Sequence, residues 1–441
     1  MPKALIQTYG CTLNQADSDA MEAILKGRGI DVEREGSASD DNYDYVIVNT
    51  CTVKTATEQR ILERLKRLQK MGRRLIVTGC MASANEDKVL GAAPDSSLVT
   101  TSNIHRIADA LSDISNGSRA VYDAYVKSEK QGHFRGEGSA IARIPISEGC
   151  LSSCSFCETK FARGPLNSFS SNVILRSIEM AIKGGAREIE LTSQDTGAYG
   201  ADRRTDIAEL VHAASELDGD FRIRIGMLNP EHLHKYIDSL IDAYKSDNVY
   251  KFAHLPVQSG SDRVLGDMGR NYLVEEFEGM ANELKSKIPE ISIATDMIVG
   301  YPTESDPDFE MSMRLIERVG FSRINVSRFG KRPHAGASKL KQLKSEVVKQ
   351  RCISMYRLSR RMEIGSLTKV VGERRTILLT ERNADSITGR DQSYRQVALR
   401  EPGFRVGEFV DVEIIGNTPA CLIGRPVGTV NKIEQVSYFR S

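Results

Sequence analysis

EGCLSSCSFC, residues Glu148–Cys157, is the stretch around which the rest of the chain is organised. It places three cysteines at Cys-x3-Cys-x2-Cys spacing in a short polar loop, just after a mostly apolar run from Ile141 to Ile146. So close a spacing lets one loop wrap three thiolates around one centre, and thiolates select iron–sulfur clusters, zinc or copper(I). A structural zinc site requires four ligands, but the next cysteine downstream is Cys352. On a 4Fe-4S cluster, three thiolates would leave one iron open to a substrate or cofactor.

The three cysteines are Cys150, Cys154 and Cys157, and Phe156 directly precedes the third. This pattern resembles the signature of the radical S-adenosylmethionine (SAM) superfamily. In that superfamily the open iron chelates the amino and carboxylate groups of SAM, and an electron from the cluster splits the sulfonium to a 5′-deoxyadenosyl radical. A zinc knuckle is the alternative interpretation. A disulfide framework is not expected in a long chain with eight cysteines and no secretory signal.

The composition is that of an ordinary globular protein. The chain has 441 residues, 40% apolar and 27% charged, which suggests two to four domains. The formal net charge of +1 does not indicate whether the protein binds nucleic acid. Any such indication must come from how the charges are distributed along the chain. No run of about 18 apolar residues exists, so no transmembrane helix is expected. The N-terminus reads as a strand and not as a signal peptide, which predicts a cytoplasmic protein with no membrane partner.

The first third of the chain alternates short apolar runs with helical patterns. Runs at residues 4–8, 45–50 and 75–78 are typical of buried parallel strands, and residues 56–70 carry an apolar stripe at helical spacing. This alternation predicts a doubly wound α/β domain over residues 1–120. A polar, glycine-containing linker is expected over residues 121–138.

Each of the three predicted strands is followed by a cysteine: Cys11, Cys51 and Cys80. Parallel strands bring their carboxyl ends to one edge of a sheet, where such folds place ligand sites. Gly10 and Gly79 would allow close backbone approach beside the thiols. Three separate buried apolar cysteines are the alternative. We interpret the trio as ligands of a second iron–sulfur cluster, again with one open iron.

Three stretches now resemble a known family: Thr8–Asp19 (TYGCTLNQADSD), Val48–Val53 (VNTCTV) and Val77–Ala82 (VTGCMA). They are similar to the methylthiotransferases, two-cluster radical SAM enzymes that insert sulfur and a methyl group into a C–H bond. The motif TLNQADSD resembles the archaeal and eukaryotic methylthiotransferases that act on threonylcarbamoyladenosine in tRNA. It is less similar to the branches that act on isopentenyladenosine in tRNA or on a ribosomal protein. The resemblance covers about residues 3 to 435.

The middle of the chain repeats the strand–helix alternation. Strand-like runs lie at residues 142–147, 188–192, 221–226, 249–255, 291–299 and 323–327. Repeated βα units predict a partial (βα)6 TIM-type barrel over residues 139–366, with functional residues after the carboxyl ends of its strands.

The resemblance implies which of these rim residues contact SAM. The expected SAM-binding residues are Phe156, Gln194, Asp195, Gln258, Ser259, Ile298 and Gly300. A loop cap or turn former is the alternative role for each of them. No catalytic residue beyond the cluster ligands is expected. The seven histidines lack the spacing of a helical zinc site, so they are interpreted as solvent or packing residues, with His254 at a strand end the exception to watch.

Positive charge gathers in the last third. Between Ser322 and Arg375 there are 15 Lys and Arg against three Glu, a net +12 on a chain of +1. A local positive field attracts phosphate backbones, and the alternative is a solvated basic helix over about residues 344–364. The arginines expected to bind RNA are Arg357, Arg360, Arg361, Arg374 and Arg375.

After Leu367 the pattern changes to short β runs separated by Gly and Pro turns. The runs lie at residues 369–371, 376–380, 394–399, 409–415, 420–423 and 435–438. They predict a small antiparallel barrel over residues 367–435. It resembles the TRAM domain, an OB-like RNA-binding module.

Taken together, the resemblance implies an enzyme that converts N6-threonylcarbamoyladenosine at position 37 of tRNA to its 2-methylthio derivative. Its cofactors would be two 4Fe-4S clusters and SAM. Its partners would be the tRNA anticodon stem-loop, a flavodoxin- or ferredoxin-like electron donor and a sulfur source, and it would act as a monomer. The alternatives are isopentenyladenosine tRNA or a ribosomal-protein aspartate as substrate, and a non-catalytic RNA-binding metalloprotein.

Overall fold

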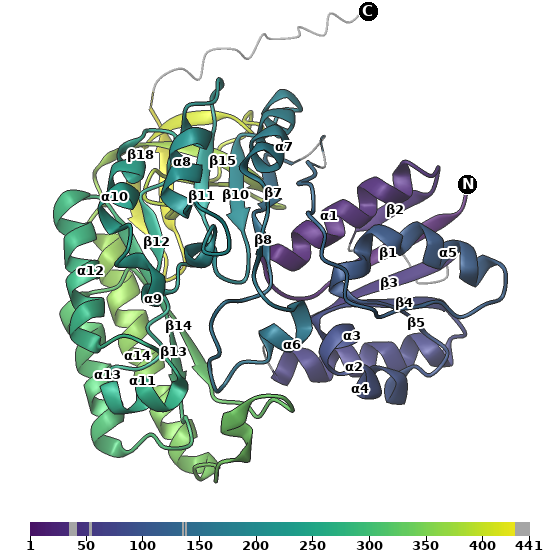
Figure 1. The fold of residues 1–441 in the computed structure, drawn as a ribbon. Helices are drawn as coiled ribbons and strands as arrows, with labels where there is room; N and C mark the ends of the chain where they lie inside the picture. Colours follow the sequence, from purple (N-terminus) through teal and green to yellow (C-terminus); the bar gives the residue numbers. More distant parts are fainter. Residues whose placement is uncertain (35–41, 53–54, 135, 137–138, 428–441) are drawn as a thin grey trace, which may run out of the picture.

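A computed structural model describes residues 1–34, 42–52, 55–134, 136 and 139–427. The chain folds into three successive parts, each with its own sheet or barrel, which we call the first, second and third layer. In Figure 1 the N-terminal sheet lies beside a half-open barrel of strands and helices, with the smaller C-terminal barrel packed on the end of that barrel. Within the described residues, none of the helices combines the length and the hydropathy needed to cross a membrane.

The first layer is a six-stranded parallel sheet in the order β2-β1-β3-β4-β5-β6. Its strands are β1 (Lys3–Thr8), β2 (Asp31–Arg34), β3 (Tyr45–Thr50), β4 (Arg74–Gly79), β5 (Ser97–Val99) and β6 (Val121–Tyr122). Its helices are α1 (Thr12–Lys26), α2 (Thr55–Lys70), α3 (Cys80–Ala84), α4 (Glu86–Ala92), η2 (Thr101–Arg106) and α5 (Ile107–Ser115). The predicted doubly wound α/β domain is confirmed.

Successive side chains along each strand point to opposite faces of the sheet, so the core of this layer has one half on each face. Ile6, Ile47 and Ile76 pack with residues of α1 and α5, whereas Leu5 and Val77 pack with residues of α2 and α4 on the other face. Burying each such side chain contributes about 1.5–3 kcal/mol.

The second layer is the partial barrel. Its strands are β7 (Ile141–Pro145), β10 (Glu188–Thr192), β11 (Arg222–Ile225), β12 (Phe252–His254), β13 (Ser292–Val299) and β14 (Arg323–Arg328). They form two parallel three-stranded sheets, which parallel bridges from Ile223 to Val249 and from Met227 to His254 join in chain order. The short pair β8 (Ser147–Glu148) and β9 (Asn167–Ser168) follows the first strand.

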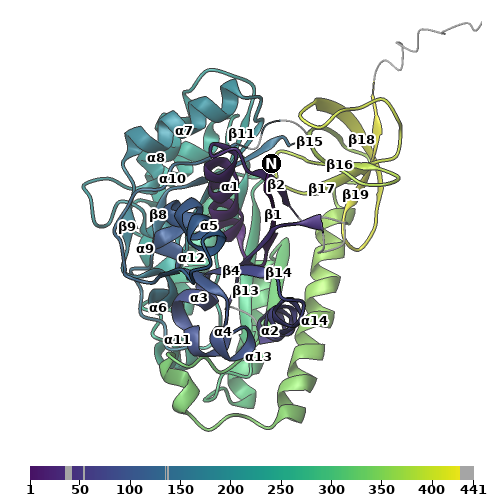
Figure 2. The same cartoon turned by 90° about the vertical axis from the view of Figure 1, so that its right-hand side faces the viewer.

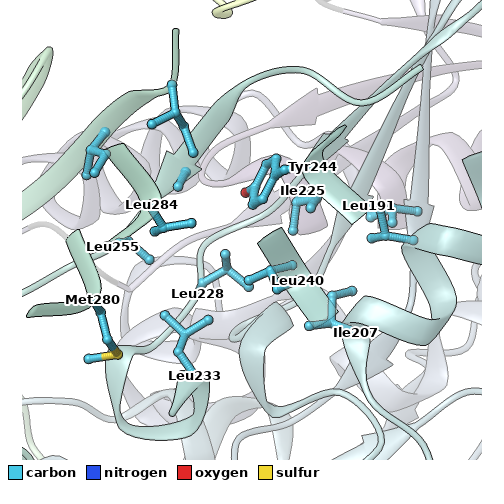
Figure 3. Packing of buried hydrophobic residues seen from close by; sticks show 14 of the residues in the cluster. Leu191, Ile207, Ile225, Leu228, Leu233, Leu240, Tyr244, Leu255, Met280 and Leu284 are labelled. Carbon is cyan, nitrogen blue, oxygen red and sulfur yellow. The ribbon is translucent and has the colours of Figure 1, made fainter. Parts of the chain in front are cut away.

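Helices follow the strands of this barrel, and the longer ones cover its outside (Figure 1). The helices are α6 (Thr159–Arg163), α7 (Ser171–Lys183), η3 (Thr196–Ala198), α8 (Ile207–Ser215), α9 (Pro230–Leu233), α10 (Ile237–Lys245), α11 (Asp262–Met268), α12 (Val274–Lys287), α13 (Asp306–Val319), η4 (Gly336–Lys339) and α14 (Ser345–Thr368). Figure 3 shows Ile225 from β11 beside Tyr244 and Leu240 from α10, and Leu284 from α12 near Leu255 in the same core. The predicted partial TIM-type barrel is confirmed.

The third layer is a closed five-stranded barrel in the order β15-β16-β17-β19-β18. Its strands are β15 (Arg374–Arg382), β16 (Ile387–Arg390), β17 (Gln396–Leu399), β18 (Phe409–Asn417) and β19 (Leu422–Pro426). All pairs are antiparallel except β17 with β19, which is parallel. The long helix α14 leads into this barrel (Figure 2).

Two details of the third layer differ from the sequence prediction. The strand expected at residues 369–371 is a turn, because α14 continues to Thr368 and Val370 N–H then bonds back to Leu367 O at 3.3 Å. The strand β16 was missed because Ile387-Thr-Gly-Arg holds a single large apolar residue. Its Gly389 is required, since a Cβ there would lie 2.3 Å from Leu378 O. The run at 435–438 lies outside the described residues.

Candidate functional site

Cys11, Cys51 and Cys80 follow β1, β3 and β4, three neighbouring strands of the parallel sheet. The strand order reverses between β1 and β3, so the trio lies at the topological switch point, where open α/β sheets bind ligands. Gly10 and Gly79 have φ values of +121° and +85° and permit close approach: a Cβ on Gly10 would lie 3.0 Å from Cys51 Cβ.

Asn14, in the first turn of α1, marks where the thiols converge. Its Oδ1 lies 3.9 Å from Cys11 Sγ and 3.8 Å from Cys80 Sγ, and its Nδ2 donates to Thr50 O at 2.8 Å, directly before Cys51. Three cysteines up to 69 positions apart in the sequence are therefore brought to one edge of the sheet.

The loop that carries Cys150, Cys154 and Cys157 starts from β8 and is held by later segments of the barrel. Cys150 N–H donates to Gly164 O at 3.2 Å, and Ser155 N–H donates to Met268 O at 2.9 Å. Ala337 N–H in turn donates to Ser155 O at 2.8 Å. The backbone of the loop is thus fixed independently of any bound group.

The two trios lie next to each other across the boundary between the first two layers. Thr52 directly follows Cys51, Glu158 directly follows Cys157, and the Thr52 hydroxyl donates to the buried Glu158 carboxylate. The short helix α6 packs against α3, which begins at Cys80. Figure 1 shows α6 and α3 side by side between the barrel and the N-terminal sheet.

Each trio has one guanidinium against one of its sulfurs. Arg163 Nε lies 3.4 Å from Cys80 Sγ, and Arg270 Nη1 lies 3.7 Å from Cys154 Sγ. Burial raises the pKa of Cys80 and of Cys150 to about 12, and Arg163 counteracts part of the rise at Cys80. These thiols are therefore protonated at neutral pH, and metal binding would release their protons.

The donor set fits clusters better than a single ion. Three thiols and a neighbouring cation suit a negatively charged iron–sulfur cluster, whose fourth iron stays open. Among the described residues, no three Cys, His, Asp or Glu side chains are grouped as ligands of one metal ion.

Three consecutive residues after β10 present buried polar atoms to the inside of the barrel rim. Ser193 Oγ, Gln194 Oε1 and Asp195 Oδ2 have no hydrogen-bond partner, although Asp195 Oδ2 lies 3.4 Å from His232 Nε2. The other oxygen, Asp195 Oδ1, accepts from Gly197 N–H at 2.9 Å and from Asn229 N–H at 3.0 Å. Unsatisfied buried atoms are costly, so Gln194 and Asp195 fit a polar cofactor such as SAM.

Four other expected SAM contacts form two pairs: two apolar side chains, and two small residues that shape the backbone. Phe156 and Ile298 lie together against one apolar cluster that includes Tyr301 and Phe329, which suits an adenine ring. Ser259 is buried and its Oγ accepts from Ser261 N–H at 3.2 Å, so it also shapes the turn. Gly300 packs against α14, because a Cβ there would lie 2.6 Å from a Val348 methyl group.

Gln258 has the left-handed backbone φ of +73°, rare for a non-glycine residue. Its N–H donates to Asp296 O at 2.9 Å and its carbonyl accepts from Ile298 N–H at 3.0 Å, and these two bonds hold the backbone in this conformation.

Replacement of Gln258 by Val is expected to destabilise the protein by about 1–2 kcal/mol, because a β-branched side chain clashes with the backbone in this region. Replacement by Gly, the matched control, should cost nothing. Chemical denaturation measures both, and equal losses would contradict the strain.

The five arginines expected to bind RNA have different environments. Arg357 and Arg374 are exposed, and Arg361 is exposed with a long contact to Glu317. Arg360 donates to Pro419 O at 2.9 Å and so ties α14 to the C-terminal barrel. Arg375 is paired with Glu373 and Glu290, and its side chain is 13% exposed. Only the first three present a cation freely to solvent.

Sequence reasoning missed Arg270 and assigned no role to Arg163. Arg163 lies six residues after the third cysteine, and this proximity was a usable signal. Nothing local marks Arg270, which lies 113 residues after Cys157 in sequence, and Arg270 reaches Cys154 only through the fold.

Two family models match the chain. Residues 3–101 match the uncharacterised protein family UPF0004, and residues 144–316 match the radical SAM superfamily. The radical SAM methyltransferase TsrM from Kitasatospora setae superposes with a TM-score of 0.57 over 77% of each chain at 12% identity, which shows a shared fold.

Curated relatives match over nearly the whole length. The probable threonylcarbamoyladenosine tRNA methylthiotransferase of Archaeoglobus fulgidus is 38% identical over 93% of this chain and 96% of that protein. The threonylcarbamoyladenosine tRNA methylthiotransferase of Homo sapiens is 31% identical over 96% of this chain and 74% of that protein. On this identity and coverage, the chain belongs to the threonylcarbamoyladenosine tRNA methylthiotransferase family of radical SAM proteins.

Proposed function

We propose that this protein inserts a methylthio group at C2 of N6-threonylcarbamoyladenosine at position 37 of tRNA. Family membership supports the reaction and the substrate. The observation that carries the proposal is the placement of two cysteine trios side by side, joined by the Thr52–Glu158 and Arg163–Asn14 contacts. One trio alone would suffice for radical chemistry, whereas sulfur insertion requires a second centre close to the first.

In the proposed mechanism Cys150, Cys154 and Cys157 hold one 4Fe-4S cluster, and Cys11, Cys51 and Cys80 hold the other. When bound, the first cluster and SAM supply the radical that activates the C–H bond, and the second cluster supplies the site of sulfur delivery. Gln194 and Asp195 offer unsatisfied oxygens to the polar groups of SAM, and Phe156 with Ile298 offers an apolar wall. Arg270 and Arg163 hold positive charge against Cys154 and Cys80.

The RNA partner would approach along α14 and the C-terminal barrel, which we infer to be a TRAM-type module. An anticodon-loop base is unpaired, so it can enter the barrel mouth at little unstacking cost. We further propose that the protein acts in the cytoplasm as a monomer, with a flavodoxin- or ferredoxin-like electron donor and an added source of sulfur.

The test of the function is nucleoside mass spectrometry. The purified, anaerobically reconstituted enzyme should convert an anticodon stem-loop that carries N6-threonylcarbamoyladenosine to its 2-methylthio product. The matched stem-loop with isopentenyladenosine should stay unchanged. Bound iron should be about eight per chain, as two 4Fe-4S clusters require. No methylthio product on the first RNA would overturn the proposal, and zinc in place of iron would favour a non-catalytic metalloprotein.

Substituting Arg357 by Ala should weaken stem-loop binding several-fold, because this exposed cation is free to contact a phosphate. Each lost phosphate contact should lower the slope of log affinity against log salt by about 1. Arg375→Ala is the matched control, since Glu373 and Glu290 already engage that guanidinium. Fluorescence anisotropy over a salt series measures both. An unchanged slope for Arg357→Ala would remove α14 from the interface.

A further inference from the structure

The inward faces of the barrel strands carry charged and polar side chains below the carboxyl rim. Along β11, Ile223 and Ile225 pack outward into the helix-covered core, so Arg224 points to the opposite, inner face. Phe252 and His254 share the inner face of β12, two residues apart. Arg224 and His254 give this inner face polar groups that an apolar ligand could not pair.

Arg224 is a cation of this lumen whose closest contacts are two aromatic rings. Its guanidinium lies 5.7 Å from the Phe252 ring centroid and 5.5 Å from that of Tyr394. Its Nε is buried without a hydrogen-bond partner. Within the parts of the chain that the structure describes, Arg224 has neither an ion pair nor a hydrogen bond. Arg224 is half-buried, and a partly desolvated guanidinium with no counter-ion in contact is suited to bind an anion.

Two carboxylates of β10, Glu190 beside Arg224 in the sheet register and Glu188 deeper in the lumen, are already engaged. Tyr250 and Tyr394 donate their hydroxyls to Glu188 at 3.1 and 3.0 Å, and Glu190 accepts from Tyr394 and pairs with Arg143 at 3.4 Å. Burial, reinforced by Glu190, raises the pKa of Glu188 to about 7, so this residue carries only part of a charge at neutral pH. Both carboxylates act on Arg224 from beyond ion-pair distance.

A chain of polar groups lies on the neighbouring strands. His254 Nε2 is 3.0 Å from Asp296 Oδ2, and Asn325 Nδ2 donates to Asp296 Oδ1 at 2.8 Å. The side chains of His254 and Asp296 remain 17% and 30% exposed, so a group in the lumen can reach them. Asp296 offers lone pairs to N–H or O–H donors.

The C-terminal barrel closes the floor of the lumen. Tyr394, at a left-handed φ of +63°, packs its ring 4.9 Å from that of Tyr250 and 5.0 Å from that of Phe252. Gln392 fixes the same loop by donating to Val249 O at 3.0 Å and accepting from Arg222 Nε at 2.9 Å. Tyr394 therefore lies beside Arg224 at the floor of the lumen.

We propose that Arg224 binds the carboxylate of the substrate's threonylcarbamoyl group, while Asp296 accepts from the N–H or O–H donors of that group. This inference rests on the proposed function and names the residues that select its substrate. The threonylcarbamoyl group carries a carboxylate, a hydroxyl and amide N–H donors, which match the lumen. An isopentenyl group carries no polar atom, so burying it here would desolvate Arg224 without supplying a counter-ion.

The test compares two anticodon stem-loops that differ only in charge. One carries N6-threonylcarbamoyladenosine and the other carries its threonyl methyl ester, which keeps the shape and removes the anion. Binding to the reconstituted holoenzyme with SAM but without reductant is measured by fluorescence anisotropy. The wild type should prefer the acid by about tenfold or more, the value expected of a hydrogen-bonded charge pair. Arg224→Met should bind both RNAs equally, and Arg224→Lys should keep part of the preference.

The matched control is Arg176→Met on the outer helix α7, because this arginine is exposed and takes no part in the lumen. Its preference for the acid should equal that of the wild type. The readout is a ratio within each variant, so a general loss of stability does not alter it. An Arg224→Met enzyme that keeps the wild-type ratio, or a wild type with no preference, overturns the inference. Methylthiolation of the acid RNA by the wild type is scored separately, so either result leaves the proposed function to its own test.

Discussion

Replacing Cys51 by Ala is expected to stop methylthio product formation while SAM cleavage continues. Cys51 belongs to the trio at the edge of the N-terminal sheet, and the Cys150–Cys157 loop is held by its own barrel contacts through Met268 and Ala337. Replacing Cys154 by Ala should abolish cleavage and product formation together, because no radical can then form. Mass spectrometry of 5′-deoxyadenosine and of the methylthio nucleoside measures the two activities in one sample.

Iron content gives a second readout for the same pair of variants. Each substitution should lower bound iron from about eight towards about four per chain. Cys352→Ala is the control, since Cys352 lies on α14 and packs against the barrel core away from both trios. Equal loss of cleavage in the Cys51 and Cys154 variants would contradict the division of labour, as would eight irons in either of them.

The sequence predicted the sheet, the barrel and the grouping of the cysteines because each depends on a local pattern joined to a general rule. Apolar runs of four to six residues predict buried strands, and parallel strands bring their carboxyl ends together. Those two steps were enough to place Cys11, Cys51 and Cys80 at one edge.

The contacts that the sequence could not predict join residues far apart in the chain. Arg163 meets Asn14 across 149 positions, and Tyr394 meets Glu188 across 206. No periodicity or spacing encodes such pairs, because they depend on how finished layers pack. The same limit applies to charge: the sequence placed Arg375 in a basic run, but folding pairs it with Glu290. Arg224 gave no signal for the same reason, since only the fold reveals that its closest contacts are two aromatic rings.

Replacing Arg163 by Met should produce the largest loss of stability of any single change near the site. Its side chain is fully buried, and Nη1 lies 2.7 Å from Asp17 Oδ2 and 2.8 Å from Glu148 Oε1. Nη2 donates to Asn14 Oδ1 at 2.6 Å, the same atom that lies beside Cys11 and Cys80. Lys130 pairs with the same two carboxylates, so the buried group of four charges is neutral.

Without Arg163 the group carries a net negative charge, and removing one partner of a buried ion pair costs about 3–5 kcal/mol. Arg163→Lys should recover part of this, because a lysine restores the charge but cannot form the fork of contacts. Arg163→Met combined with Asp17→Asn should also lose less unfolding free energy than Arg163→Met alone, since the buried group is then neutral again.

Denaturation of the metal-free protein measures these losses of stability. The iron content of the reconstituted variants measures whether Cys11, Cys51 and Cys80 still bind a cluster. A loss below about 1 kcal/mol with full iron would mean that Arg163 neither joins the layers nor positions the cysteines. If the double variant is stable yet poor in iron, charge balance holds the layers together and the contact with Asn14 positions the thiols.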